Sequence, residues 1–481
     1  MSDDPETETR TPAKLIGLIL GPVLFAATFV IAPPEGLAPE AWRVAGLALW
    51  MAVWWATEAL PIAATSLLPL VVIGLIGAGT ERQAAAPYAN PIVLLLMGGS
   101  ILAVAIERWG LHKRFALSAL SLAKGKPGAL VFGFMAVTAF ISMWISNTAT
   151  ALMMMPIALS VAAAAGPNQK RFAQALVLGV AYAASIGGVA TPIGTPTNLI
   201  AMGWMKEELG TSVSFIHWLG VGLPTMLLLL PAAWLVVTFG MNAGNTSLGV
   251  AGEEIAAERA ALGPMSGPEV RVLIVFATVI ALWMSGEFLR KSLGLPGLTD
   301  MAIVVGGAIA MMLLPAGKAA PGRALLIWPE AVKIPWGVML LFGGGLSLAE
   351  AMERTKLAEW LGLGLSGLAG AEPILIVLAV TALVIVLTEF MSNVATITML
   401  LPVLGALAKA TGIDPVVLVV PAAIAASCGF MMPAGTGPNA VAFASGRTTV
   451  AGMMGRGVWV NIAALAIMTA IGVWLAPQVL G

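Results

Sequence analysis

Hydrophobic residues follow one another along the chain in long runs that short polar segments separate. Many of these runs approach the roughly 20 residues that an α-helix needs to cross the hydrocarbon of a lipid bilayer. A membrane β-barrel would instead show segments of about 10 residues in which apolar and polar positions alternate, and the sequence contains no such segment. The pattern therefore predicts an all-α polytopic membrane protein.

Two kinds of apolar stretch are present. Eleven stretches fit transmembrane helices, the fifth and tenth of them interrupted: 15–32, 42–58, 62–79, 91–109, 172–202, 217–240, 270–288, 300–315, 335–353, 415–446 and 457–478. Stretches 129–165 and 373–408 are each long enough for two helices but carry a polar cluster at the centre. Polar backbone at membrane depth is tolerated only where it is buried in protein or lines a cavity. We therefore expect two re-entrant hairpins, which enter the membrane and return to the same side.

Three segments of the first half recur in the second half in the same order. GGSILAVAIER (98–108) matches GGLSLAEAMER (344–354), SNTAT (146–150) matches SNVAT (392–396), and PIGTPTN (192–198) matches PAGTGPN (433–439). The offset is 246 residues for the first two pairs and 241 for the third. The chain therefore contains two repeats. Helix packing alone explains them poorly, because packing does not require Pro and Gly at equivalent depths.

The repeats predict a domain plan. A tail (1–14) and a first transmembrane helix (15–32) precede repeat 1 (42–240, with hairpin 129–165), and a linker (241–269) leads to repeat 2 (270–481, with hairpin 373–408). Five spans and one hairpin in each half give an odd number of crossings, so the second repeat is expected to be inverted across the membrane. Inverted repeats with interrupted helices at the midplane are typical of secondary transporters.

Composition and charge narrow the class further. Hydrophobic residues make up 59% and charged residues 10% of the 481 positions, and the formal net charge is +0. Neither a soluble globular fold nor a nucleic acid partner is therefore expected. If the N-terminus is cytoplasmic, 16 of the 24 Lys and Arg residues fall in inside loops and 8 in outside loops. Because inside loops are enriched in Lys and Arg, we expect a multi-pass protein of the inner (plasma) membrane with a cytoplasmic N-terminus.

The polar clusters offer oxygen atoms and helix ends to a ligand. The hairpin tips Ser146–Asn147 and Ser392–Asn393 consist of residue types that cap helix N-termini. A helix start presents free N–H groups and about half a positive charge, which suits a carboxylate. Carbonyls freed in the breaks around Gly194 and Gly435, together with Ser and Asn oxygens, suit a hard monovalent cation. No Lys, Arg or His lies within these clusters, so a bound dianion would need mobile cations, and we expect coupled entry of sodium.

These residues resemble the motifs of the divalent anion:sodium symporter family, which contains the di- and tricarboxylate carriers. The two SNT-type tips, the two GT-containing breaks and the duplication carry the resemblance. It implies a homodimer with eleven spans and two re-entrant hairpins per protomer. It also implies an elevator mechanism that carries small dicarboxylates, of the succinate, malate and fumarate class, with two or more sodium ions.

The resemblance also assigns roles to residues. The first sodium site is implied to contain Ser142, Ser146, Asn147 and the Gly194 region, and the second to contain Thr388, Ser392, Asn393 and the Gly435 region. The carboxylate-binding set is implied to be Asn147, Thr148, Thr195, Asn393 and Thr436. The second motif departs from the first at Val394, which stands where the first has Thr148 and removes a hydroxyl from one carboxylate position.

Other functions remain open from the sequence. The chain is also compatible with a dicarboxylate exchanger, or with a sodium symporter for sulfate or citrate. Glu389, an acidic residue within the second hairpin, is a candidate for carrying protons or for tuning the second cation site. An enzyme is not expected, because an intramembrane hydrolase needs a paired acid, a Ser–His set or metal ligands at depth, and Glu389 alone provides none of these.

Overall fold

The structure is a computed structural model that describes residues 11–120, 127–165, 169–241, 256–364 and 370–480. Within these ranges every regular element is a helix, and the one extended pairing is an isolated bridge between Pro315 and Ala324. The prediction of an all-α fold is confirmed for this part of the chain.

Seven of the described helical segments are long and apolar enough to cross a bilayer. They are α1 (Pro12–Val30), the run Glu81–Arg108, α9 (Asn147–Ala164), α12 (Phe215–Thr238), the first part of α14 (Gly267–Leu293), α20 (Asn393–Thr411) and the run Val450–Leu480. Further apolar helical segments of 10–17 residues accompany them, among them α8 (Pro127–Ser142), α15 (Asp300–Leu313), α19 (Pro373–Thr388) and α21 (Pro415–Ala425). Length and hydropathy thus place the chain among polytopic membrane proteins.

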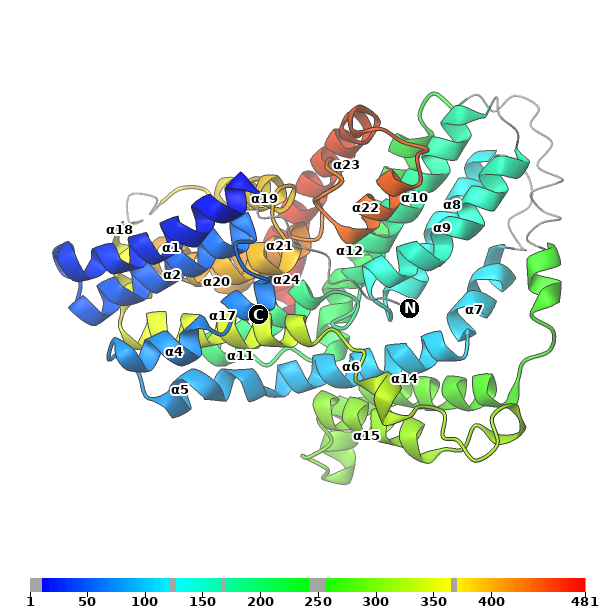
Figure 1. Cartoon of the computed structure of the whole chain (residues 1–481), viewed down its shortest axis with the longest axis horizontal. Helices are drawn as coiled ribbons and strands as arrows, with labels where there is room; N and C mark the ends of the chain where they lie inside the picture. Colours follow the sequence, from blue (N-terminus) through cyan, green and yellow to red (C-terminus); the bar gives the residue numbers. More distant parts are fainter. Residues whose placement is uncertain (1–10, 121–126, 166–168, 242–255, 365–369, 481) are drawn as a thin grey trace. The chain divides into compact units, whose positions relative to one another are not determined.

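The chain divides into two compact units. The first comprises Met1–Asn90, Trp336–Ala369 and Thr398–Gly412. Its helices are α1, α2 (Pro39–Thr57), α3 (Ile62–Thr65), α4 (Leu68–Leu75), α5 (Glu81–Ala85), η1 (Ala86–Ala89), α17 (Trp336–Arg354), α18 (Leu357–Gly364) and most of α20. Helices α1 and α2 lie side by side (Figure 1). On α17, Gly344 permits close packing, because a Cβ there would lie 2.2 Å from the carbonyl oxygen of Ser66.

The prediction of one continuous span over 62–79 is wrong. The structure has two helices, α3 and α4, separated at Ser66 and Leu67. Pro69 explains the interruption, because proline lacks an N–H donor and its ring clashes with the carbonyl four residues earlier, which belongs to Thr65. Proline is tolerated within the first turn of a helix, and Pro69 lies in the first turn of α4.

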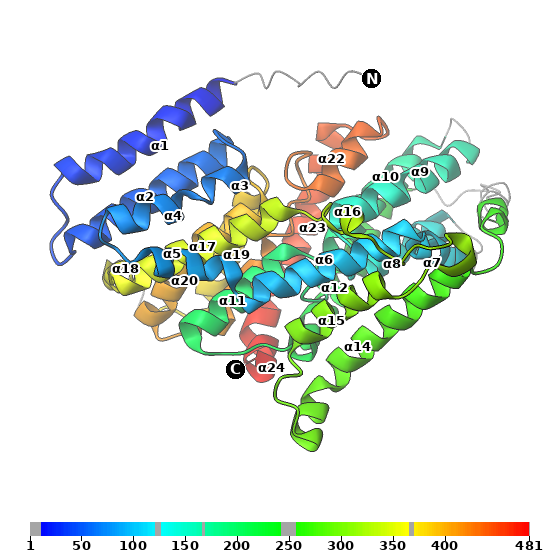
Figure 2. The same cartoon turned by 60° about the horizontal axis from the view of Figure 1, so that its bottom comes forward.

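The second unit comprises Pro91–Pro335, Gly370–Ile397 and Ile413–Gly481. Its helices include α6 (Pro91–Arg108), α7 (Leu111–Leu120), α8, α9, α10 (Lys170–Gly188), α11 (Pro196–Leu209), α12, α14, α15, η2 (Gly317–Ala319), α16 (Trp328–Ala331), α19, α21, α22 (Gly437–Ala444), α23 (Val450–Ala470), a π-helical turn η4 (Ile471–Leu475) and α24 (Ala476–Leu480). Helix α15 packs against both α6 and α14 (Figure 2). All of the predicted site residues belong to this unit.

Helix boundaries recur between the two halves. Helices α8 and α19 begin at Pro127 and Pro373, and α9 and α20 begin at Asn147 and Asn393, an offset of 246 residues in both cases. Each half also has a helix break, over 189–195 between α10 and α11 and over 426–436 between α21 and α22. The duplication found in the sequence is therefore also present in the secondary structure.

Parts of the predicted domain plan fall outside the described residues. These are 1–10 of the tail, 121–126 and 166–168 of repeat 1, 242–255 of the linker, and 365–369 and 481 of repeat 2. Helix α1 begins at Pro12 rather than at residue 15, because the Thr11 hydroxyl accepts a hydrogen bond from the Lys14 N–H. Helix α14 begins within the predicted linker, at Gly267, where Ser266 and Glu269 form a capping box.

Candidate functional site

The first polar cluster forms where the α8–α9 pair meets the first helix break. Ser142 ends α8 and Asn147 begins α9, and the Ser142 hydroxyl donates to the Ala184 carbonyl at 2.6 Å. The Ser142 oxygen also lies 2.8 Å from the side-chain amide of Asn147. Gly188 makes room for that amide, since a Cβ there would lie 2.2 Å from Asn147 Oδ1. Residues of α8 and α10 therefore converge on the carboxamide that begins α9.

The Asn147 carboxamide has two possible orientations. In one, its nitrogen donates to the carbonyl oxygens of Gly194 and Ala184, at 3.2 Å each, and to the Ser142 hydroxyl at 2.8 Å. In the other, its oxygen faces these same acceptors. An oxygen that faces only acceptors is unfavourable unless a cation lies between them, because buried polar atoms need partners. The cluster therefore has three oxygen atoms around the end of the Asn147 carboxamide, which can turn its own oxygen toward them as a fourth.

The second polar cluster repeats this arrangement. The Thr388 hydroxyl donates to the Ala426 carbonyl at 2.5 Å and lies 2.9 Å from the Asn393 carboxamide. In its alternative orientation, the Asn393 nitrogen donates to Thr388 Oγ1 at 2.9 Å, the Ala426 carbonyl at 3.1 Å and the Gly435 carbonyl at 3.0 Å. Both clusters thus contain a hydroxyl, a carboxamide, a carbonyl from the helix before the break or its end, and a glycine carbonyl within the break.

Two predicted ligands, Ser146 and Ser392, have other contacts. The Ser146 hydroxyl caps α9 by accepting from the Ala149 N–H at 3.3 Å. The Ser392 carbonyl accepts a hydrogen bond from the Thr396 hydroxyl at 3.1 Å. Neither hydroxyl forms a hydrogen bond with the two clusters among the described residues.

Two asparagines that the sequence analysis missed hold the breaks in shape. The Asn198 side-chain nitrogen donates to the carbonyls of Gly188, Val189 and Thr191, at 3.0, 3.3 and 2.8 Å. Asn439 donates in the same way to the carbonyls of Gly429 and Met432, at 2.8 and 2.9 Å. Both side chains are fully buried. Each asparagine is the last residue of a repeated PxGTxxN motif, which was the signal available in the sequence.

The two halves meet at these breaks. Helix α9 packs against α22, and α11 packs against α21. Gly437 of α22 lies against Thr148 of α9, and a Cβ on Gly437 would come within 2.0 Å of the Thr148 hydroxyl. Nearby, the hydroxyls of Thr197 and Ser427 form a buried hydrogen bond of 3.1 Å between the halves. The two halves therefore contact each other beside the breaks, at the starts of α9, α11 and α22 and at Ser427 of the second break.

The remaining predicted carboxylate ligands lie at the starts of the helices that follow the breaks. Thr195 is the N-cap residue of α11 and is 3% exposed. Thr436 is the N-cap residue of α22, is 7% exposed, and accepts from the Asn439 N–H at 3.2 Å. Thr148 is exposed at the start of α9. Among the described residues no hydrogen bond joins the first cluster directly to the second. The contact of Thr148 with Gly437 joins a predicted ligand of the first half to helix α22 of the second half.

Glu389 is buried and hydrogen-bonded. Its carboxylate, 1% exposed, accepts from the Met431 N–H at 2.9 Å, the Met432 N–H at 2.8 Å and the Asn461 side chain at 2.7 Å. A Cβ on Gly435 would lie 3.1 Å from its Oε2. The carboxylate therefore lies beside the second polar cluster and supports the same break.

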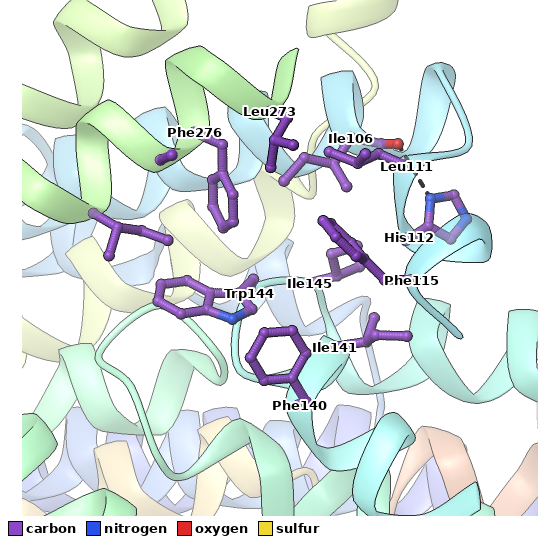
Figure 3. A pocket seen from close by; sticks show the side chains of 12 residues that line it. Ile106, Leu111, His112, Phe115, Phe140, Ile141, Trp144, Ile145, Leu273 and Phe276 are labelled. Atoms are coloured by element: carbon purple, nitrogen blue, oxygen red, sulfur yellow. Dashed lines mark hydrogen bonds between the residues drawn. The ribbon is translucent and has the colours of Figure 1, made fainter. Parts of the chain in front are cut away.

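An apolar cavity of about 190 Å³ lies next to the loop between α8 and α9. Phe140, Trp144 and Ile145 approach it from one side, and Leu273 and Phe276 of α14 from the other (Figure 3). His112 at the edge of the cavity forms a hydrogen bond of 3.1 Å between its Nδ1 and the Ile106 carbonyl oxygen. Burial lowers the pKa of His112, because desolvation disfavours the imidazolium. The cavity thus presents hydrocarbon and a neutral ring, which cannot compensate the charge of an anion.

The helical fold, the long apolar segments and the buried clusters of neutral oxygens define a polytopic membrane transporter. Residues 12–480 of the chain match the family model of the sodium:sulfate symporter transmembrane region. The chain belongs to this family. This confirms the resemblance found in the motifs and, since the family consists of symporters, the expectation of a transporter rather than an enzyme.

Named relatives and a solved structure agree with this assignment. The sodium-dependent dicarboxylate transporter SdcS of Staphylococcus saprophyticus is 38% identical, over 100% of this chain and 95% of its own length. The protein of the same name from Staphylococcus aureus (strain bovine RF122) is 40% identical, over 97% of this chain and 92% of its own. The YdaH transporter of Alcanivorax borkumensis is 14% identical in sequence, with a TM-score of 0.57 over 97% of this chain and 98% of its own, which shows a shared fold.

Proposed function

We propose that the protein is a sodium-coupled symporter of small dicarboxylates, of the succinate, malate and fumarate class. The relatives named as sodium-dependent dicarboxylate transporters support this substrate choice. The observation that carries the proposal is the pair of carboxamides, Asn147 and Asn393, each of which can turn an oxygen toward a hydroxyl and two carbonyl oxygens. Oxygen donors without a net charge suit a hard monovalent cation.

Charge balance links the cations to the anion. The residues that define the two clusters are Ser142, Asn147, Thr388 and Asn393 with their backbone partners, and none of them is basic. A dianion moved into a medium of low dielectric constant carries a cost of many kcal/mol unless positive charge accompanies it. Sodium ions in the two clusters provide that charge, so substrate and cations stabilise each other and enter together. Two or more sodium ions per cycle follow from the two clusters.

The carboxylates lie between the two halves in this proposal. Thr148 and Asn147 at the start of α9, with Thr195, bind one end of the substrate, and Asn393 with Thr436 bind the other. The N-termini of α9 and α20 contribute N–H groups and partial positive charge. The proximity of Thr148 to Gly437, next to Thr436, supports the pairing of the two sets.

The larger architecture belongs to the same proposal. The repeats are inverted, with the pairs α8–α9 and α19–α20 acting as re-entrant hairpins and the breaks at the membrane midplane. The protein works as a homodimer of elevator type in the plasma membrane, with tail 1–14 and linker 241–269 in the cytoplasm. The equal offsets of helix boundaries in the two halves and the distribution of Lys and Arg support this plan.

The test is uptake of labelled succinate by purified protein in liposomes. We expect accumulation with an inward sodium gradient, none with potassium or choline in its place, and faster uptake when the inside is made negative. Excess unlabelled malate and fumarate should compete, whereas sulfate and citrate should compete weakly. Uptake that needs internal dicarboxylate but no sodium gradient would identify an exchanger and contradict the proposal.

A further inference from the structure

A second cavity, of about 360 Å³, is lined by none of the residues of the polar clusters and lies at the ends of five helices of the second unit. Helices α6, α12 and α15 begin at it with Pro91, Ser214 and Thr299 as lining residues, whereas α11 and α14 end near it. Small-molecule sites in proteins have volumes of about 300–1,000 Å³. The cavity is therefore large enough for a small organic anion.

Two basic side chains line this cavity, and one of them is unpaired. Lys206, in the last turn of α11, is half-buried, and no described residue forms an ion pair or a hydrogen bond with its ammonium group. Arg290, in the last turn of α14, donates to the Leu298 carbonyl at 2.9 Å and lies 3.8 Å from Asp300 Oδ1. Asp300 is already engaged, because its other oxygen accepts from the Phe215 N–H at 2.9 Å. The charged groups lining the cavity therefore sum to one positive charge.

The backbone adds to this positive potential. Three helix N-termini, each with a partial positive charge, meet at the cavity, against two helix C-termini with the opposite charge. Because the chain as a whole has a net charge of +0, it offers no long-range attraction to anions. A local positive pocket can still concentrate an anionic substrate near the protein.

We propose that this cavity is an outer vestibule that binds a small dicarboxylate from the medium before it reaches the site between the two halves. The inference rests on the proposed function. Because linker 241–269 is cytoplasmic in that proposal, the start of α12 and the end of α14 lie on the outer side of the membrane, with Arg290 and Lys206 beside them. Lys206 contacts one carboxylate, and the ends of α12 and α15 contact the other. Asp300 keeps the affinity low, so the substrate is released onward. The vestibule raises the local substrate concentration and leaves the transport cycle itself unchanged.

Two isosteric neutralisations test the vestibule, because they change its charge in opposite directions. We expect Lys206→Gln to raise the succinate concentration for half-maximal uptake about two- to fivefold, and Asp300→Asn to lower it by a similar factor. The Asn side chain still accepts from Phe215, so the fold is retained. Lys291→Gln is the matched control, since Lys291 is exposed at the end of α14, next to Arg290 in the chain, but does not line the cavity. Maximal rate and sodium activation should stay the same in all three variants.

Initial rates of labelled succinate uptake are measured in intact cells that lack other dicarboxylate carriers, at fixed sodium and at low and high choline chloride. Both shifts should disappear at high salt, because the charges are then screened. Shifts in the same direction, or shifts that persist at high salt, would indicate a structural effect and overturn the proposal. Unchanged affinities with sodium-dependent uptake intact would overturn the vestibule alone, whereas sodium-independent uptake by the wild type would overturn the proposed function.

Reconstitution distinguishes the substrate from an anionic lipid headgroup, which shares its chemistry. The Lys206→Gln shift is compared in liposomes of phosphatidylcholine alone and in liposomes that also contain phosphatidylglycerol. An equal shift in both supports the dicarboxylate as occupant. A shift that requires phosphatidylglycerol would assign the cavity to lipid and contradict the proposal.

Discussion

The two polar clusters have almost the same oxygen geometry but different neighbours. In both, a hydroxyl at the end of one helix lies within 2.9 Å of the carboxamide that begins the next helix. The second cluster adjoins the buried carboxylate of Glu389. The equivalent position of the first half, 246 residues earlier, is Met143, whose carbonyl accepts from the Thr191 hydroxyl. The second cluster therefore has a carboxylate beside it where the first half has a methionine at the equivalent position.

This difference indicates two unequal cation sites. A carboxylate near a cation stabilises it by Coulomb attraction, and the effect is larger where water is excluded. Glu389 also fixes the second break through the N–H groups of Met431 and Met432. In the first break, uncharged side chains bond the backbone, namely those of Thr191, Asn198 and Trp218. We expect the second cluster to bind sodium more tightly, and the following predictions test or refine that comparison.

Removal of the carboxamides should have the largest effect. In Asn147→Ala and Asn393→Ala, loss of a cation ligand should cost about 2–3 kcal/mol at the affected cluster. This corresponds to a roughly 30- to 150-fold rise in the sodium concentration needed for half-maximal uptake. Sodium activation curves in proteoliposomes measure it, with size-exclusion profiles as a control for folding. Wild-type curves for both variants would eliminate the clusters as cation sites.

Neutralising the buried carboxylate should affect the second cluster alone. Glu389→Gln should lower apparent sodium affinity by about tenfold, equivalent to about 1.4 kcal/mol, because the adjacent negative charge is lost. Asn461→Ala is the matched control, since it removes one hydrogen bond from Glu389 but keeps the charge, and should have a smaller effect. The measurement is sodium activation together with its Hill coefficient. Equal losses in the two variants would mean that Glu389 acts through packing rather than through charge.

One methyl group added at Gly437 should disrupt the contact between the two halves. Gly437→Ala places a Cβ 2.0 Å from the Thr148 hydroxyl, and overpacking of this kind costs about 1–3 kcal/mol. We expect thermal stability and succinate uptake to fall, and Thr148→Ala in the same chain to restore stability in part. Thermal unfolding in detergent measures the effect. Additive losses in the double variant would show that the two residues are not in contact.

Exchanging the residue that differs between the motifs should have the smallest effect. Val394→Thr introduces the hydroxyl that the first half has at Thr148, and one added hydrogen bond to a carboxylate is worth about 1 kcal/mol. Apparent succinate affinity should rise about fivefold, and Thr148→Val should lower it by a similar factor. Competition with unlabelled succinate at saturating sodium gives both values. A decrease in affinity in Val394→Thr would show that the second half does not contact the carboxylate at this position.

Local sequence patterns were sufficient to predict the class of protein and the residues at the centre of each polar cluster. Hydrophobic runs indicated membrane helices because the bilayer imposes their length. The pairs Ser142–Asn147 and Thr388–Asn393 are five residues apart across a single helix junction, so the motif already places their side chains close together. Ser146 and Ser392 were the exceptions, because the Ser146 hydroxyl caps α9 and neither hydroxyl forms a hydrogen bond with the clusters among the described residues.

Folding alone decided the contacts between distant segments. The carbonyls of Ala184 and Ala426 and the partners of Glu389 come from segments that no period or spacing relates to the motifs. The repeated PxGTxxN motif marks Asn198 and Asn439, but only the fold decides which carbonyls they bond. The same holds for the contact of Thr148 with Gly437 and for the meeting of Lys206 with Arg290. Such contacts depend on how helices pack in three dimensions, and helix packing leaves no local signature in the order of residues.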